Sequence, residues 1–149
     1  MNKHHLWVQH RSQPTSTSCW HTCLQMISVF QPPPLGSLRY QRFLGPDGGM
    51  VATDANLSAF AGEFQLRYSP FSVYTPQQLD AHLQSGPLMI CGRWYRGRHA
   101  YVMTGIEGDG SENGTRVFID NPAERAPIDF PYGFLTGQYQ RGPFGILKH

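Results

Sequence analysis

The chain has 149 residues, of which 40% are hydrophobic and 15% charged, and its formal net charge is +2. This length suits one domain with one core, so we expect residues 1–149 to form a single domain. The small net charge argues against a nucleic-acid-binding protein, and no apolar stretch is long enough to span a bilayer. We therefore expect neither nucleic acid nor a membrane as a partner. Three cysteines are too few for a disulfide framework.

The N-terminal residues 1–12 are polar and rich in histidine. They contain no apolar core of the kind that a secretory signal peptide needs. We expect them to form a loose segment ahead of the domain, and we expect the protein to be cytoplasmic as made.

The first half of the sequence predicts helices and loops. Residues 18–30 carry apolar side chains at the period of a helix, which should form one buried stripe. These positions are Trp20, Cys23, Leu24, Ile27 and Phe30. Residues 35–51 contain several glycines and predict a long surface loop, of the kind that is often functional. A short helix is expected at 53–60 and a short strand at 64–69.

A second helix is expected over residues 76–85. Thr75 is of a residue type that is preferred at the N-cap of a helix, and Pro76 suits the first helical position. Gln78 lies three residues after Thr75 and would complete a capping box. Gly86 and Pro87 follow and should end the helix.

The second half of the sequence predicts strands. Apolar runs cover 88–91, 99–106 and 115–120, and a hairpin-type loop lies at 108–114. The tail, 130–147, alternates aromatic residues with Gly and Pro and is expected to add edge strands. Helices followed by an antiparallel meander predict an α+β fold in which a helical N-terminal half packs on a C-terminal sheet.

Cys19 is the candidate nucleophile. It would lie in the first turn of the helix over 18–30, where unpaired N–H groups and the helix dipole favour a thiolate over a thiol. A thiolate is the reactive form in cysteine catalysis. Gln13 lies six residues earlier, and its side-chain amide can supply an N–H beside the backbone N–H of Cys19. Together these two donors would form an oxyanion hole.

His99 is the candidate base. It opens an apolar strand, and a residue at the end of a strand is both rigid and accessible. Asp120 and Asn121 end the strand that should pair with the strand of His99. A carboxylate or amide there can hold the imidazole in one tautomer. Position favours Asn121 slightly, because Asp120 should point to the opposite face of its strand; both residues remain candidates.

Together these residues resemble the papain-like cysteine peptidases. The resemblance rests on Gln13 with Ser18, Cys19 and Trp20, then on His99–Ala100 before a strand, and on the residues before Pro122. The order Cys, His, Asn/Asp agrees as well. Residues 86–122 are closest to a compact bacterial branch, which includes avirulence-effector cysteine proteases and the leader-peptidase domains of bacteriocin exporters.

The resemblance implies a papain-like fold and acyl transfer through a thioester. His99 would take the proton of Cys19, Asn121 or Asp120 would orient the ring, and Gln13 would hold the oxyanion. Trp20 would pack beneath the site. Trp94 and Tyr95 precede His99 and would line a substrate cleft. No cofactor or metal is implied.

The sequence departs from papain itself. Ser16 and Thr17 replace the Cys-Gly pair that precedes the nucleophile region in the plant enzymes, so their disulfide is absent. The gap between Cys19 and His99 is also shorter than in papain-type enzymes. The specificity of papain should therefore not be transferred to this chain.

We expect a cysteine protease that acts on a protein substrate, as a bacterial toxin or effector domain. By analogy with the compact branch it would be secreted by a dedicated system, would act in the cytoplasm of a target cell and would have an immunity protein that blocks the cleft. Two alternatives stay open. One is a peptidoglycan amidase or endopeptidase with the same Cys-His chemistry, and the other is an inactive, peptidase-like binding module.

Overall fold

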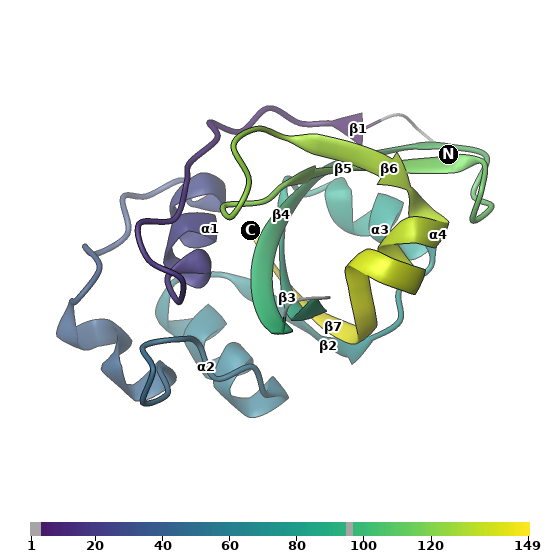
Figure 1. Cartoon of the computed structure of the whole chain (residues 1–149). Coiled ribbons are helices and arrows are strands. Elements are labelled where there is room, and N and C mark those ends of the chain that lie inside the picture. Colours follow the sequence, from purple (N-terminus) through teal and green to yellow (C-terminus); the bar gives the residue numbers. More distant parts are fainter. Residues whose placement is uncertain (1–3, 95–96) are drawn as a thin grey trace.

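A computed structural model of the chain describes residues 4–94 and 97–149. Its centre is one curved antiparallel sheet with the strand order β2-β7-β3-β4-β5-β6 (Figure 1). The strands of this path are β2 Arg67–Ser72, β3 Leu88–Trp94, β4 Gly97–Gly108, β5 Thr115–Asp120, β6 Ile128–Pro131 and β7 Gln140–Lys148. The predicted meander is therefore present as β3 to β6.

The helices lie on both faces of the sheet (Figure 1). One group comes from the N-terminal half of the chain. It consists of α1 Cys19–Ile27, the 3-10 helix η1 Leu38–Phe43 and α2 Asp54–Glu63. The other group consists of α3 Pro76–Leu83, the short α4 Tyr132–Phe134 and the π-helical turn η2 Leu135–Tyr139.

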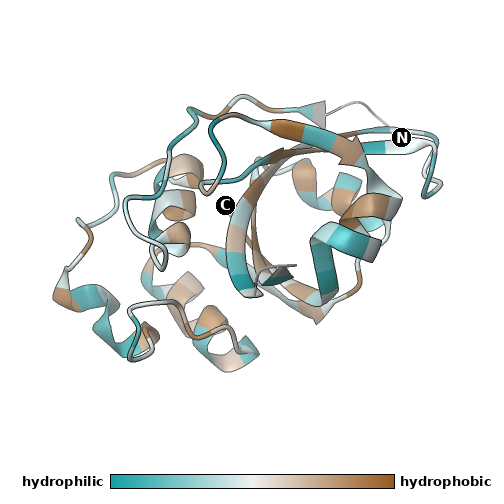
Figure 2. Cartoon of the chain, viewed as in Figure 1, coloured by the Kyte–Doolittle hydropathy of each residue, from teal (hydrophilic) through white to brown (hydrophobic). Residues whose placement is uncertain are grey.

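Each face of the sheet has its own core, because neighbouring residues of a strand point to opposite sides. Met89 and Cys91 of β3 pack with the helices α1 and α2, whereas Leu88 and Ile90 pack with α3. In Figure 2 the apolar residues lie along β4 and its neighbouring strands, between the two groups of helices. The central strands β3 and β4 are thus buried on both sides over most of their length, and they contain continuous apolar runs.

Local signals in the sequence account for several element boundaries. The capping box of α3 is present, with the Thr75 hydroxyl accepting from the Gln78 N–H and the Gln78 side chain accepting from the Thr75 N–H. Thr53 caps α2 by accepting a hydrogen bond from the N–H of Asn56. The predicted strand 115–120 agrees with β5 at both ends.

Three expectations need correction. Phe30 is not part of the buried stripe, because α1 ends at Ile27 and Phe30 is 66% exposed. The loop expected over 35–51 contains η1, whose Tyr40 and Phe43 are buried in the core. In the tail, β6 is an edge strand but β7 lies inside the sheet, between β2 and β3. The local composition of the tail contains no signal for this long-range pairing.

The N-terminal segment is not loose where the structure describes it. β1, His4–His5, pairs with Gly105 and Ile106 of β4, and the N–H of Leu6 donates to the carbonyl of Thr104. β3 pairs with β4 only as far as Met103. β1 pairs with the residues of β4 that follow, along the same edge of that strand. This backbone pairing holds the segment against the sheet. Within the described residues, none of the helices has the length and apolar character needed to cross a membrane.

Candidate active site

Cys19 is the first residue of α1 and is half-buried. Ser18, the N-cap, makes no side-chain capping bond, and the first N–H groups of a helix have no partner within it. The backbone N–H groups of Ala100, Trp20 and Cys19 itself face the Cys19 sulfur. These donors lower the pKa of the thiol, but burial is the larger effect and leaves the pKa above its ordinary value. The helix terminus alone thus does not produce the thiolate that we expected.

His99 is the third residue of β4, not the first, and is 8% exposed. Its Nε2 lies 2.6 Å from Oδ1 of Asn121. Because this oxygen can only accept, Nε2 carries the proton and the lone pair of the neutral ring is on Nδ1. Burial lowers the pKa of His99, and the hydrogen bond to Asn121 opposes this shift by raising it. Burial therefore favours the neutral imidazole.

Asn121 is completely buried and is held at both ends of its amide. Its Oδ1 also accepts from the N–H of Ala123 at 2.9 Å, and its Nδ2 donates to the hydroxyl of Tyr139 at 2.5 Å. Tyr139 belongs to η2. Sequence reasoning missed Tyr139, because no motif or spacing connects this tail residue to His99.

Among the described residues, the side chain of Asp120 bonds to His10 and not to His99. Its Oδ1 lies 2.5 Å from Nδ1 of His10, on the N-terminal segment. Successive residues at the end of β5 point to opposite sides, so Asp120 faces the N-terminal segment and Asn121 faces His99. Of the two candidates, the structure brings Asn121 to the imidazole.

Cys19 and His99 line one cavity of about 530 Å³. Gly45, Pro46 and Asp47 border it on the side of the predicted surface loop. Trp20 lies at the cavity with 1% exposure, and its Nε1 donates to the carbonyl of Gly48 at 3.3 Å. The indole thereby joins the nucleophile helix to the loop that borders the cavity.

The match to a known family comes from the sequence. A model of the family described as "Papain-like cysteine protease AvrRpt2" matches residues 2–128. The chain belongs to this family of papain-like cysteine proteases. The resemblance inferred from Gln13, Cys19 and His99 is therefore confirmed at the level of the family.

The fold agrees with this assignment. The crystal structure of UfSP from C. elegans superposes with a TM-score of 0.65 at 12% sequence identity. The match covers 98% of this chain and 34% of that protein, so the chain spans about a third of UfSP. The expected α+β papain-like fold is confirmed. No curated protein matches the sequence.

Gln13 of this papain-like protease lies outside the cavity of Cys19. Its side-chain Nε2 donates to the carbonyl of Thr15 at 2.8 Å, and it lines a separate hollow with Pro122. Its Oε1 is buried and has no hydrogen-bond partner among the described residues. A single side-chain hydrogen bond thus holds the amide in this position.

The remaining predicted residues are less defined. Tyr95 and the side chain of Trp94 lie outside the described residues, so their place in a substrate cleft stays a prediction. All three cysteines are free, and Cys23 and Cys91 are buried. Burial raises the pKa of both thiols. Within the described ranges, no group of three His, Cys, Asp or Glu side chains is arranged to hold a metal ion.

Proposed function

We propose that this papain-like protease hydrolyses peptide bonds of a protein substrate with Cys19 as nucleophile and His99 as general base and acid. One observation carries the proposal: the imidazole fixed by Asn121 lines the same cavity as the half-buried thiol. Asn121 acts through His99 and is a positioning residue. The hydroxyl of Tyr139 holds Asn121 in place by accepting a hydrogen bond from its Nδ2.

The reaction starts from a neutral pair. Burial raises the pKa of Cys19 and lowers that of His99, so thiol and imidazole are both uncharged at rest. As the sulfur attacks the scissile carbonyl, its proton moves to Nδ1 of His99, the C–S bond forms and the carbonyl oxygen becomes an oxyanion. His99 then gives the proton to the leaving amine as the C–N bond breaks. Water attacks the thioester with His99 as base, which releases the acid and restores the thiol.

The oxyanion needs donors at the start of α1. The backbone N–H of Cys19 is one, since it faces the reacting sulfur and precedes the first helical hydrogen bond. We assign Gln13 as the second donor, after rotation of its side chain away from Thr15. Oε1 has no partner among the described residues, and this supports the assignment, because within that part of the chain only the side-chain bond to Thr15 opposes the rotation.

The biological setting is a separate part of the proposal. We infer that the domain is a bacterial toxin or effector, made in the cytoplasm, exported by a dedicated system and active in the cytoplasm of a target cell. The resemblance to avirulence-effector proteases supports this inference. An immunity protein that covers the cavity of Cys19 would protect the producing cell.

The chemistry is tested by labelling and cleavage. The wild type, Cys19→Ala and His99→Ala are treated with iodoacetamide, labelled sites are read by mass spectrometry, and cleavage of unfolded proteins is followed in parallel. We expect Cys19 to be labelled ahead of the buried Cys91, and both variants to lose cleavage. Cys91→Ala is the matched control and should cleave normally. Muropeptides released from purified sacculi, without cleavage of any protein, would contradict the proposal in favour of the peptidoglycan alternative.

The effector role is tested in cells. The domain is expressed in the cytoplasm of bacteria that lack its producer's immunity functions. Growth arrest by the wild type, absent with Cys19→Ala at equal protein level, is the expected result. Normal growth together with cleavage in vitro would overturn the effector role and leave the protease activity intact.

A further inference from the structure

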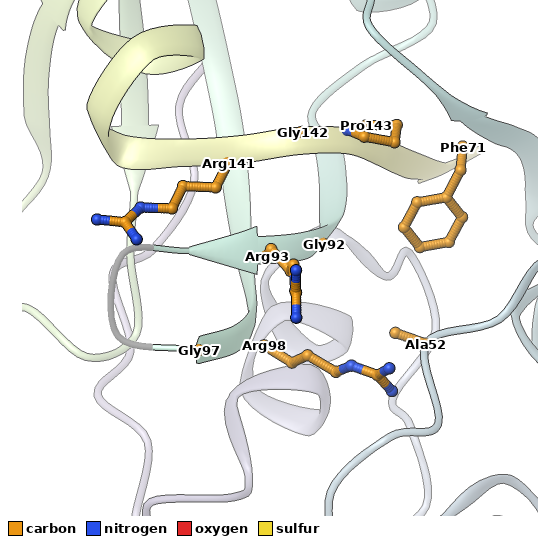
Figure 3. A pocket seen from close by; sticks show the side chains of 9 residues that line it. All are labelled: Ala52, Phe71, Gly92, Arg93, Gly97, Arg98, Arg141, Gly142 and Pro143. Atoms are coloured by element: carbon orange, nitrogen blue, oxygen red, sulfur yellow. The ribbon is translucent and has the colours of Figure 1, made fainter.

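A second cavity, of about 700 Å³, lies beside the cavity of Cys19 and is lined by three arginines (Figure 3). They are Arg93, Arg98 and Arg141, one on each of the neighbouring strands β3, β4 and β7. The two cavities adjoin each other, because Arg98 and Ala52 line both of them. Whatever occupies the arginine cavity therefore lies next to the reacting thiol.

The three arginines form one row across the sheet. Arg93 is the direct cross-strand partner of Arg98 on β4 and of Arg141 on β7. Directly opposite residues of antiparallel strands point to the same face, with Cβ atoms about 4.5–5.5 Å apart. Figure 3 shows the side chain of Arg98 extending toward Ala52 with that of Arg93 above it, while the guanidinium of Arg141 points to the opposite side, away from Ala52 and Phe71. The row thus brings three positive charges to the lining of this cavity.

A bulge in β7 creates this alignment. Gly92 pairs with Phe144, but the next residue, Arg93, pairs with Arg141, so Gly142 and Pro143 of β7 have no partner in β3. Gly142 has φ of +77°, a conformation that favours glycine. Bulges of this kind redirect side chains and are common next to active sites. Without the two extra residues, Arg141 would not lie opposite Arg93.

The row is unfavourable for the free protein. Like charges placed directly opposite on neighbouring strands destabilise a sheet. Within residues 4–94 and 97–149, no carboxylate lines this cavity and no ion pair involves the three guanidinium groups. Elsewhere, Arg39 and Arg42 pair with Glu63 and Arg116 pairs with Asp129, whereas the single exposed residues Arg11 and Arg125 have no ion pair among the described residues. The missing counter-charge points to a ligand that supplies it.

We propose that the row of Arg93, Arg98 and Arg141 binds an acidic segment of the protein substrate and directs cleavage to peptide bonds near Asp or Glu residues. This proposal rests on the proposed protease function. The arginine cavity adjoins the cavity of Cys19, and for that reason we identify its ligand as a segment of the substrate. Phe71 and Pro143 supply an apolar side to the same cavity. The segment would combine carboxylates facing the guanidinium groups with apolar contacts along its length.

Direct binding tests the row without catalysis. The 149-residue chain with Cys19→Ala is titrated into two fluorescent peptides, one of Glu and Gly and the other with Gln in place of every Glu, and anisotropy is measured. At low salt the acidic peptide should bind about tenfold tighter or more, and added salt should reduce this preference. Arg93→Gln combined with Arg141→Gln should remove it. Arg39→Gln combined with Arg42→Gln removes the same charge elsewhere and should keep it.

Three results would overturn the inference. These are equal binding of both peptides, equal loss in the two double variants, and displacement of the acidic peptide by a single-stranded oligonucleotide that binds more tightly. The last result would assign the row to nucleic acid. Urea unfolding separates folding defects from lost recognition: the Arg93/Arg141 double variant should unfold at the same or a higher urea concentration, since a repulsion is removed.

Kinetics in the active protein connects the row to cleavage. For substrates with Glu near the scissile bond, the Arg93/Arg141 double variant should raise KM about tenfold with little change in kcat, and it should leave neutral substrates unaffected. Iodoacetamide labelling of Cys19 should stay as in the wild type. A wild type that cleaves nothing would refute the protease function, while the peptide titration would still decide the binding role of the row.

Discussion

The Nδ1 atom of His10 lies 2.5 Å from Oδ1 of Asp120, although 110 positions separate the two residues in the sequence. Asp120 is 1% exposed, so its carboxyl group depends on this contact. The bond fastens the N-terminal segment to the end of β5, immediately before the residue that holds His99. The segment therefore belongs to the support of the candidate active site.

Replacing His10 should destabilise the protein. His10→Ala leaves Asp120 buried without its partner, which is expected to cost about 1–3 kcal/mol of the free energy of unfolding. Urea denaturation followed by tryptophan fluorescence measures the change. In the double variant with Asp120→Asn the loss should be smaller, because the buried group left without its partner is then an amide instead of a carboxyl group. A single variant as stable as the wild type would show that the contact contributes nothing.

Removing the amide of Asn121 should change both the rate and the pH profile. The hydrogen bond raises the pKa of His99, against a larger lowering by burial from the ordinary value of 6.5. The base must be neutral, so kcat/KM falls as pH drops through the pKa of His99. In Asn121→Ala that pKa falls further, and the acid limb of the profile should move to lower pH. We also expect kcat to fall about 10- to 100-fold, because the ring is no longer oriented.

The pH profile decides whether Asn121 works through His99. A fall in kcat with an unchanged acid limb would mean that the substitution acts only through packing. A shift of the limb to higher pH would contradict the sign of the predicted effect. Thermal unfolding of the variant shows whether the fold is retained.

Tyr139 should act as a positioning residue through Asn121. Tyr139→Phe removes the hydroxyl that accepts from Nδ2 of Asn121. One such bond is worth about 1 kcal/mol, so kcat should fall about fivefold while KM is unchanged. Tyr132→Phe is a matched control, since its buried hydroxyl donates to the carbonyl of Tyr74 away from the site. Equal effects of the two variants on kcat would rule out a specific role for Tyr139.

Gln13 tests the oxyanion hole. If its amide rotates away from Thr15 when substrate binds, Gln13→Ala should lower kcat about 100-fold with little change in KM. Gln13→Glu keeps the size of the side chain but removes the N–H donors, and it should lose as much activity. Full activity of Gln13→Glu would show that the N–H donors of Gln13 play no part in catalysis and that another donor serves the oxyanion.

Much of the local structure follows from the sequence alone. Helix ends are encoded by neighbouring residues, as in the capping box of Thr75 and Gln78, and the alternation of β5 is complete within six residues. The pattern of Gln13, Cys19 and His99 also indicated the papain-like family, because these residue types in this order resemble that family; the chemistry of a nucleophile, its base and an oxyanion donor restricts only the residue types.

Only the tertiary structure decided which distant residues meet. Asp120 and Asn121 were both candidates in the sequence, with a slight preference for Asn121, and the direction of each side chain at the end of β5 gave Asp120 to His10 and Asn121 to His99. Likewise, no local signal places β7 between β2 and β3, which is what aligns Arg141 with Arg93. These contacts depend on pairing between segments far apart in the chain, and the free energy of that pairing comes from the assembled sheet, not from the residues next to each position.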